Sequence, residues 1–155
     1  MSFMIIEMYP IAYVCCERDT LADDGWGDVE SVIELSEEMP TESLDGLDDF
    51  SHLEIIYHLH LVGENEVLLG SEHPRENPDW PKVGIFAQRK KNRPNRLGLT
   101  IVELIKREGR RLTVKGLDAI DGTPILDIKP VMQEFLPRKA LHQPDWVRDL
   151  MQDYW

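Results

Sequence analysis

Short stretches of alternating or consecutive apolar residues recur along the chain, and they predict a protein built mainly from β-strands. These stretches are enriched in β-branched and aromatic side chains, which pack well on a pleated surface. Glu108 and Gly109 separate two of the stretches and predict a tight hairpin. The strands are expected at residues 4–16, 29–35, 50–61, 83–88, 97–106, 111–116 and 125–128.

Helical signals are fewer and weaker. A short helical turn is expected from Thr41 toward Gly46, and residues 144–154 predict an amphipathic C-terminal helix. Its apolar stripe carries Trp146, Leu150 and Tyr154, and this stripe should dock on the body of the protein or on a partner. Because strands outnumber helices and rarely alternate with them, the prediction is a mainly β fold, a small antiparallel β-barrel with short helices.

Composition fits one domain spanning residues 1–155, since 42% of the residues are apolar and 30% are charged. No run of about 18 apolar residues occurs, so no membrane is expected as a partner. The N-terminal sequence MSFMIIEMYP has no basic leader, and we therefore expect a cytoplasmic protein. Cys15 and Cys16 are adjacent in a predicted strand, where their side chains point to opposite faces and should stay reduced.

The net charge of −12 conceals a division along the chain. Residues 1–81 hold 20 acidic and 2 basic side chains, whereas residues 82–116 hold 2 acidic and 11 basic ones. Two explanations remain open for the basic block, residues 82–116: it meets an anionic substrate, or it faces the acidic remainder within one chain or across a dimer.

Common catalytic and nucleotide-binding motifs are missing from the sequence. It contains no GxGxxG turn, phosphate-binding P-loop, HExxH helix, CxxC pair or GxSxG elbow. His58 and His60 share one face of a predicted strand, but no third ligand lies nearby in the sequence, so no metal is expected.

Residues 84–100, GIFAQRKKNRPNRLGLT, form the most unusual loop of the chain. Its closely spaced cations repel one another unless anionic or carbonyl-rich groups lie among them. Pro94 fixes the backbone, Asn95 tolerates unusual dihedrals and Gly98 permits close approach. This composition favours a preorganised loop that presents its guanidinium groups in fixed directions, although a solvated basic turn is the alternative. The cations are Arg89, Lys90, Lys91, Arg93 and Arg96.

Three segments together resemble one known family, the TsaA-like or TrmO family of S-adenosylmethionine (SAM)-dependent tRNA methyltransferases. They are LDGLDDFSHLEIIYHLH at residues 44–60, KVGIFAQRKKNRPNRLGLT at residues 82–100 and GLDAIDGTPILDIKPV at residues 116–131. Their order and separations match the family's pattern, and the resemblance covers most of residues 5–135.

This resemblance implies a small β-barrel, a homodimer, and SAM held near the subunit interface by the second and third segments. Asp121 and Asp127 are the candidates for a catalytic base, if the acceptor must lose a proton. Turn capping and strand-end hydrogen bonding are the alternative roles for these two carboxylates. The cofactor residues carried over are Arg89, Arg93, Pro94, Asn95, Leu97, Gly98, Asp118, Ile120, Asp121, Gly122, Thr123, Pro124 and Lys129, with Asp127 beside them.

The chain departs from the family's pattern where the substrate is expected. The family's ATRSPFRPNPIG differs from this chain at Gln88, Lys90, Lys91, Asn92 and Arg96, and Glu54 replaces a tryptophan. Three functions therefore stay open. The first is N-methylation of a modified adenosine in tRNA, threonylcarbamoyladenosine next to the anticodon. The others are methylation of a small-molecule acceptor and SAM binding without catalysis. DNA is not expected as a partner.

Overall fold

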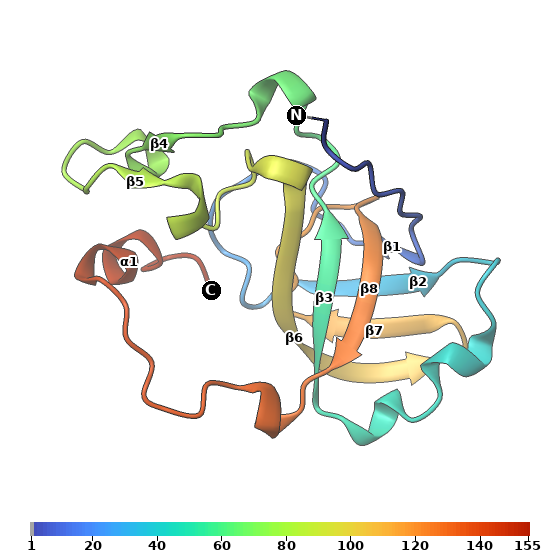
Figure 1. Ribbon diagram of the computed structural model, residues 1–155. Coiled ribbons are helices and arrows are strands. Elements are labelled where there is room, and N and C mark those ends of the chain that lie inside the picture. The colour runs from blue at the N-terminus through green and yellow to red at the C-terminus, as the bar shows by residue number, and fades with distance from the viewer. Residues whose placement is uncertain (1) are drawn as a thin grey trace.

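The computed structural model describes residues 2–155, and six of its strands close into an antiparallel barrel (Figure 1). Around the barrel the strands follow the order β1, β2, β7, β6, β3 and β8. The predicted small antiparallel β-barrel is therefore confirmed. Its strands are β1 (Ala12–Cys15), β2 (Glu30–Leu35), β3 (His52–His58), β6 (Leu97–Glu108), β7 (Arg111–Lys115) and β8 (Pro124–Pro130).

A two-stranded sheet and short helices decorate the barrel. Strands β4 (Ser71–Glu72) and β5 (Val83–Gly84) form the small sheet, which lies beside one end of the barrel (Figure 1). Within residues 2–155 the only α-helix is α1 (Asp145–Leu150). No helix of this region has the length and apolar character needed to cross a membrane. The 3₁₀ helices are Thr41–Leu44, Leu47–Asp49, Glu64–Glu66, Pro74–Glu76, Ile85–Ala87, Pro94–Arg96 and Gln133–Phe135.

Alternation along the strands fills the barrel interior with apolar side chains. In β3, Leu53, Ile55 and Tyr57 point inward and are at most 4% exposed. Val102 of β6 and Val114 of β7 join them in the same core cluster. Burial of apolar surface is the main stabilising contribution to such a fold, at about 25 cal/mol per Å². Trp26, in the loop before β2, is also buried.

The structure corrects three predicted elements. The first strand covers only Ala12–Cys15 of the predicted residues 4–16, because Pro10 has no N–H to donate and the side chains of residues 3–9 are exposed. The strand predicted at residues 83–88 ends at Gly84, and a 3₁₀ turn closed by Gln88 N donating to Ile85 O follows it. The C-terminal helix covers only Asp145–Leu150 of the predicted residues 144–154, and turns follow it as far as Tyr154.

Candidate functional site

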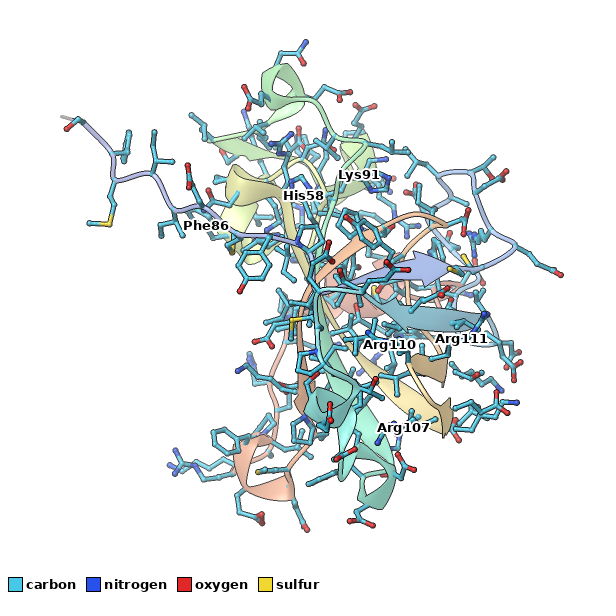
Figure 2. All side chains as sticks on the ribbon, turned by 90° about the vertical axis from the view of Figure 1, so that its right-hand side faces the viewer. His58, Phe86, Lys91, Arg107, Arg110 and Arg111 are labelled. Atoms are coloured by element: carbon cyan, nitrogen blue, oxygen red, sulfur yellow. The ribbon has the colours of Figure 1, made fainter. Side chains whose placement is uncertain are left out.

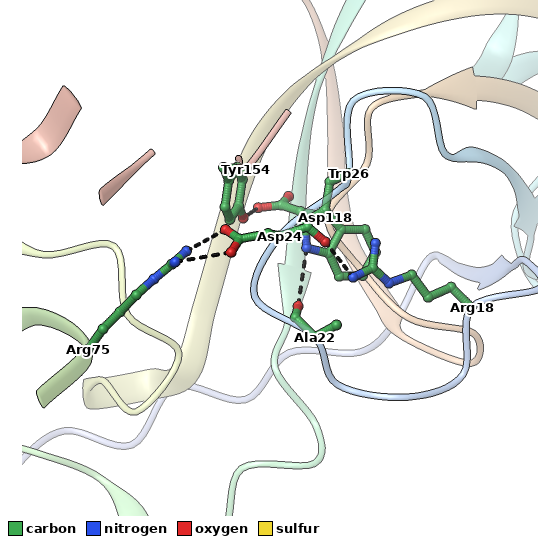
Figure 3. Close-up of polar contacts among 7 residues, drawn as sticks. All are labelled: Arg18, Ala22, Asp24, Trp26, Arg75, Asp118 and Tyr154. Carbon is green, nitrogen blue, oxygen red and sulfur yellow. Dashed lines mark hydrogen bonds and ion pairs between the residues drawn. The ribbon is translucent and has the colours of Figure 1, made fainter. Parts of the chain in front are cut away.

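Asp118 accepts hydrogen bonds from three hydroxyl groups that different parts of the chain supply. The Tyr57 hydroxyl, from β3, donates to Oδ1 of Asp118 at 3.0 Å and to its backbone oxygen at 3.2 Å. Thr100, from β6, also donates to Oδ1, whereas Tyr154 of the C-terminal segment donates to Oδ2 (Figure 3). All three donors are neutral hydroxyl groups. Two of them come from barrel strands and hold Oδ1, and the third comes from the C-terminal segment and holds Oδ2.

The two tyrosine hydroxyl groups of this cluster have raised pKa values. Burial raises the pKa of Tyr57 and of Tyr154 far above the ordinary tyrosine value, and the negative charge of Asp118 raises both further. The positive charge of Arg89 acts in the opposite direction on both hydroxyls. Arg89 also donates through Nη2 to the backbone oxygen of Leu99. Residues 82–100 and 116–131, the second and third segments of the resemblance, meet at Asp118 through the hydrogen bond from Thr100.

These raised pKa values predict a sensitivity to alkaline pH. Because the folded protein keeps Tyr57 and Tyr154 protonated while the unfolded chain ionises near pH 10, the free energy of unfolding should be unaffected by these groups below about pH 9 and fall above about pH 10. Tyrosine absorbance during titration should show two of the four tyrosines ionising only when the protein unfolds. Ionisation of all four near pH 10 in the folded protein would contradict this assignment.

Backbone carbonyls hold the arginines of residues 84–100, here named the basic loop, in place. Arg93 donates through Nη1 to Gln88 O at 2.7 Å and to Lys90 O at 3.4 Å. Arg96 donates to Val62 O at 2.6 Å. The expectation of carbonyl-rich surroundings for these cations is confirmed. The unusual backbone expected at Asn95 is confirmed too, because its φ is 63°.

Gly98 is placed by its neighbour across the sheet. It pairs with Tyr57 between β6 and β3, and a Cβ at this position would lie 2.3 Å from the tyrosine ring. Such a distance is impossible without displacing the ring. Gly98 therefore lets Tyr57 cross the strand and reach Asp118.

The turn at residues 121–124 is packed against β1. Asp121 accepts a hydrogen bond from Cys16 N at 3.0 Å, and Gly122 has a φ of +80° that suits glycine. The Thr123 hydroxyl donates to Ile120 O at 2.7 Å and is buried. The carboxylate of Asp121 thus links the turn to the end of β1, while its catalytic role stays a prediction.

Asp127 lies elsewhere, on β8 opposite Ile56 of β3. Its Oδ1 accepts from Ile128 N at 2.9 Å, and its Oδ2 lies 3.3 Å from Nζ of Lys129. Asp127 is the middle residue of β8, so the contacts lie within the strand and not at its end, and the catalytic role of Asp127 stays a prediction. The structure therefore separates the two candidate bases, because Asp121 lies beside the end of β1 and Asp127 lies within β8. Of the other cofactor candidates, Pro94 begins a 3₁₀ turn, Leu97 begins β6, Pro124 begins β8 and Ile120 is buried.

The residues predicted to face the substrate mostly anchor the loop to residues 62–72. The amide of Gln88 is buried and donates to Val83 O at 3.1 Å and to Glu72 O at 3.4 Å, while Lys90 pairs with Glu72. Asn92 donates to Glu66 O at 3.1 Å. Lys91 makes no ion pair within the described part of the chain.

The basic block is neutralised in part by acidic residues of the same chain. Lys90, Arg96, Arg107 and Lys115 pair with Glu72, Glu64, Asp45 and Asp28, at distances of up to 4.0 Å. Figure 2 shows the block divided, with Lys91 toward one end of the molecule and Arg107, Arg110 and Arg111 toward the other. For these four pairs, the explanation that the block faces the acidic remainder is confirmed.

The site contains residues that the sequence did not single out. Tyr57 and Thr100 lie inside the first and second segments of the resemblance, and a search for hydroxyl side chains there would have found them. For Tyr154, the sequence predicts only a position on the apolar stripe of the C-terminal helix. For metals, no group of three or more His, Cys, Asp and Glu side chains within residues 2–155 is arranged to hold an ion.

Comparison with known proteins finds one matching family and several relatives. The family described as the tRNA-methyltransferase O N-terminal domain matches residues 23–135. A probable S-adenosyl-L-methionine-binding protein of Methanothermobacter thermautotrophicus is 36% identical over 138 residues, which cover 86% of this chain and 96% of that protein. The human tRNA (adenine(37)-N6)-methyltransferase is 42% identical over 105 residues, 68% of this chain.

The match spans only part of several relatives. It covers 23% of the length of the human protein and 55% of that of a Pyrococcus abyssi relative. A crystal structure of TrmO superposes with a TM-score of 0.73 and 28% identity over 90% of this chain and 64% of that chain. The sequence resemblance is thus confirmed by family, relatives and fold, and the chain belongs to the tRNA-methyltransferase O N-terminal domain family.

Proposed function

We propose that this chain binds SAM at the Asp118 end of the barrel and transfers its methyl group to an adenosine in tRNA. The observation that carries the proposal is the convergence on Asp118 of Tyr57 and Thr100, because these three residues come from the three segments that resemble the family. The names of the archaeal and human relatives, a probable SAM-binding protein and a tRNA adenine methyltransferase, support this proposal.

The chemistry of the cluster suits such a cofactor. SAM carries a carboxylate that an arginine can bind, and its ammonium and ribose hydroxyl groups can donate to an aspartate. Methyl transfer is an in-line displacement, so the protein chiefly aligns the acceptor, the methyl group and the sulfur. Asp121 or Asp127 would serve as a base only where the acceptor must lose a proton early.

A small-molecule acceptor is the second candidate. It is favoured by the pairing of four basic-block cations with acidic side chains, because these pairs leave less positive charge for a phosphate backbone. The division of the block between two ends of the molecule points the same way (Figure 2).

Labelled SAM distinguishes the two acceptors. The purified protein is incubated with the labelled cofactor and either total tRNA or a small-molecule extract. Label entering tRNA, at a salt-sensitive rate, is the expected result. Label entering only the extract would replace tRNA by a small acceptor, and cofactor binding without any labelled product would leave a SAM-binding module.

A homodimer is also proposed for this chain. The support comes from exposed apolar side chains on two surfaces: Phe3 and Ile5 of the N-terminal segment are 87% and 86% exposed, and Leu99 and Ile101 of β6 are 45% and 46% exposed. Surfaces of this kind usually mark an interface. Light scattering during gel filtration would show twice the chain mass of 18.0 kDa, and a monomer would contradict the proposal.

A further inference from the structure

Residues 145–155, here named the C-terminal strap, cross the Asp118 end of the barrel. The strap holds α1 and ends beside the loop of residues 22–28 (Figure 1). Gly25 N donates to Asp153 O at 2.9 Å, and Trp26 N donates to Tyr154 O at 2.8 Å. The strap lies outside residues 23–135, the part of the chain that matches the family.

The loop beneath the strap is itself firmly built. Arg18 donates to Gly25 O at 2.9 Å and to Asp24 O at 2.7 Å, and its guanidinium stacks 3.6 Å from the centre of the Trp26 ring. Arg75 of the loop at residues 71–82 binds both carboxylate oxygens of Asp24, at 3.2 and 2.7 Å (Figure 3). The strap thus docks on a preformed platform, and only Tyr154 extends from it to Asp118.

The two oxygens of Asp118 differ in how they are held. Oδ1 receives Tyr57 and Thr100, which belong to barrel strands and stay in place whatever the strap does. Oδ2 receives Tyr154 alone. A ligand with a hydroxyl or ammonium donor would find both acceptor positions of Oδ1 filled, and at Oδ2 it would meet the hydroxyl of Tyr154.

We propose that the C-terminal strap competes with the cofactor for Oδ2 of Asp118, so that Tyr154 limits how tightly this site holds a ligand carrying a hydroxyl or ammonium donor. The inference rests on the proposed function in naming SAM as that ligand. The strap must release Asp118 before the ligand's donor takes its place. Affinity is then reduced by the fraction of molecules in which the strap is closed.

Two substitutions weaken the contact between the strap and Asp118 by different routes. Tyr154→Phe removes the hydroxyl that reaches Oδ2 and leaves the rest of the strap unchanged. Gly27→Ala acts away from Asp118, because its new Cβ would lie 2.6 Å from the backbone carbon of Trp155 and force the strap off the loop. Gly70→Ala is the matched control, since no atom lies within 4 Å of a Cβ built at Gly70.

Calorimetric titration of each full-length protein with SAM tests the proposal. Tyr154→Phe and Gly27→Ala should bind SAM more tightly than the natural chain, by about tenfold for the loss of a hydrogen bond to a charged group, and Gly70→Ala should bind as the natural chain does. Weaker binding by both variants would overturn the proposal, because Tyr154 would then help to hold the cofactor. Unchanged binding by both would overturn it as well.

Failure of the proposed function has a different signature. If neither the natural chain nor any variant binds SAM, the cofactor is wrong, and hydrogen exchange tests the strap by itself. The amides of Met151 and Tyr154, which are hydrogen-bonded within the strap, should exchange faster in Gly27→Ala than in Gly70→Ala. Equal exchange in the two variants would show that the strap does not open separately from the barrel.

Discussion

Arg93→Ala is expected to weaken SAM binding by at least about tenfold, since one hydrogen bond from a charged group contributes about 1.5–3 kcal/mol. Arg93 holds the backbone of the basic loop together by donating to Gln88 O at 2.7 Å and to Lys90 O at 3.4 Å. Without it, the loop loses the hydrogen bonds that hold its backbone, and with them the positions of the cofactor-binding candidates that it carries. Titration calorimetry measures the affinity, and the rate of label transfer from SAM should fall with it.

Lys91→Ala is the matched control for this substitution. It removes a positive charge from the same loop at a side chain that forms no ion pair within residues 2–155. A loss confined to Arg93→Ala would show that the arginine acts through its hydrogen bonds to the loop. Equal losses in the two variants would show instead that the loop acts through its total charge.

Gly98→Ala should reduce the free energy of unfolding by about 1–3 kcal/mol or more, the cost of forcing an extra group into a packed interior. The added methyl group would lie 2.3 Å from the ring of Tyr57, which is 4% exposed and cannot withdraw into solvent. Urea denaturation gives the stability. SAM affinity should fall too, because a displaced Tyr57 hydroxyl no longer holds Asp118.

The cause of this loss can be isolated with two further proteins. Gly84→Ala, in the same sequence segment, places its Cβ where no atom lies within 4 Å and should cost little. In a Tyr57→Ala background, Gly98→Ala should lose most of its effect, because the ring it strikes is gone. An undiminished cost in that background would mean that the glycine serves the strand itself and not the tyrosine.

Local patterns predicted the barrel well because its strands alternate cleanly between core and solvent. In β3, for example, Leu53, Ile55 and Tyr57 are buried and the residues between them are not. The pattern failed where a segment has strand-forming side chains but no partner strand beside it. Residues 4–11 have the composition of a strand, yet pairing begins only at Ala12. Composition indicates that a segment can form a strand, but a partner strand is needed to make it one.

The site was predictable only where its members lie in the segments shared with the family. Asp118, Arg93 and Gly98 were found through that resemblance, although the packing of Gly98 against Tyr57 was not. The contact of Tyr154 with Asp118 spans 36 residues of sequence, and that of Arg75 with Asp24 spans 51. Contacts of this range follow from how the chain folds back on itself, and no spacing in a single sequence indicates them.

Closure of the barrel has a consequence for the order in which the protein folds. The hairpin of β6 and β7 joins neighbouring residues, whereas the last seam pairs Ala12 of β1 with Ile125 of β8. Bringing such distant segments together is entropically slow, so the hairpin should form early and the seam late. On the ribosome, β1 must therefore wait for β8 to be synthesised before it finds both of its neighbours.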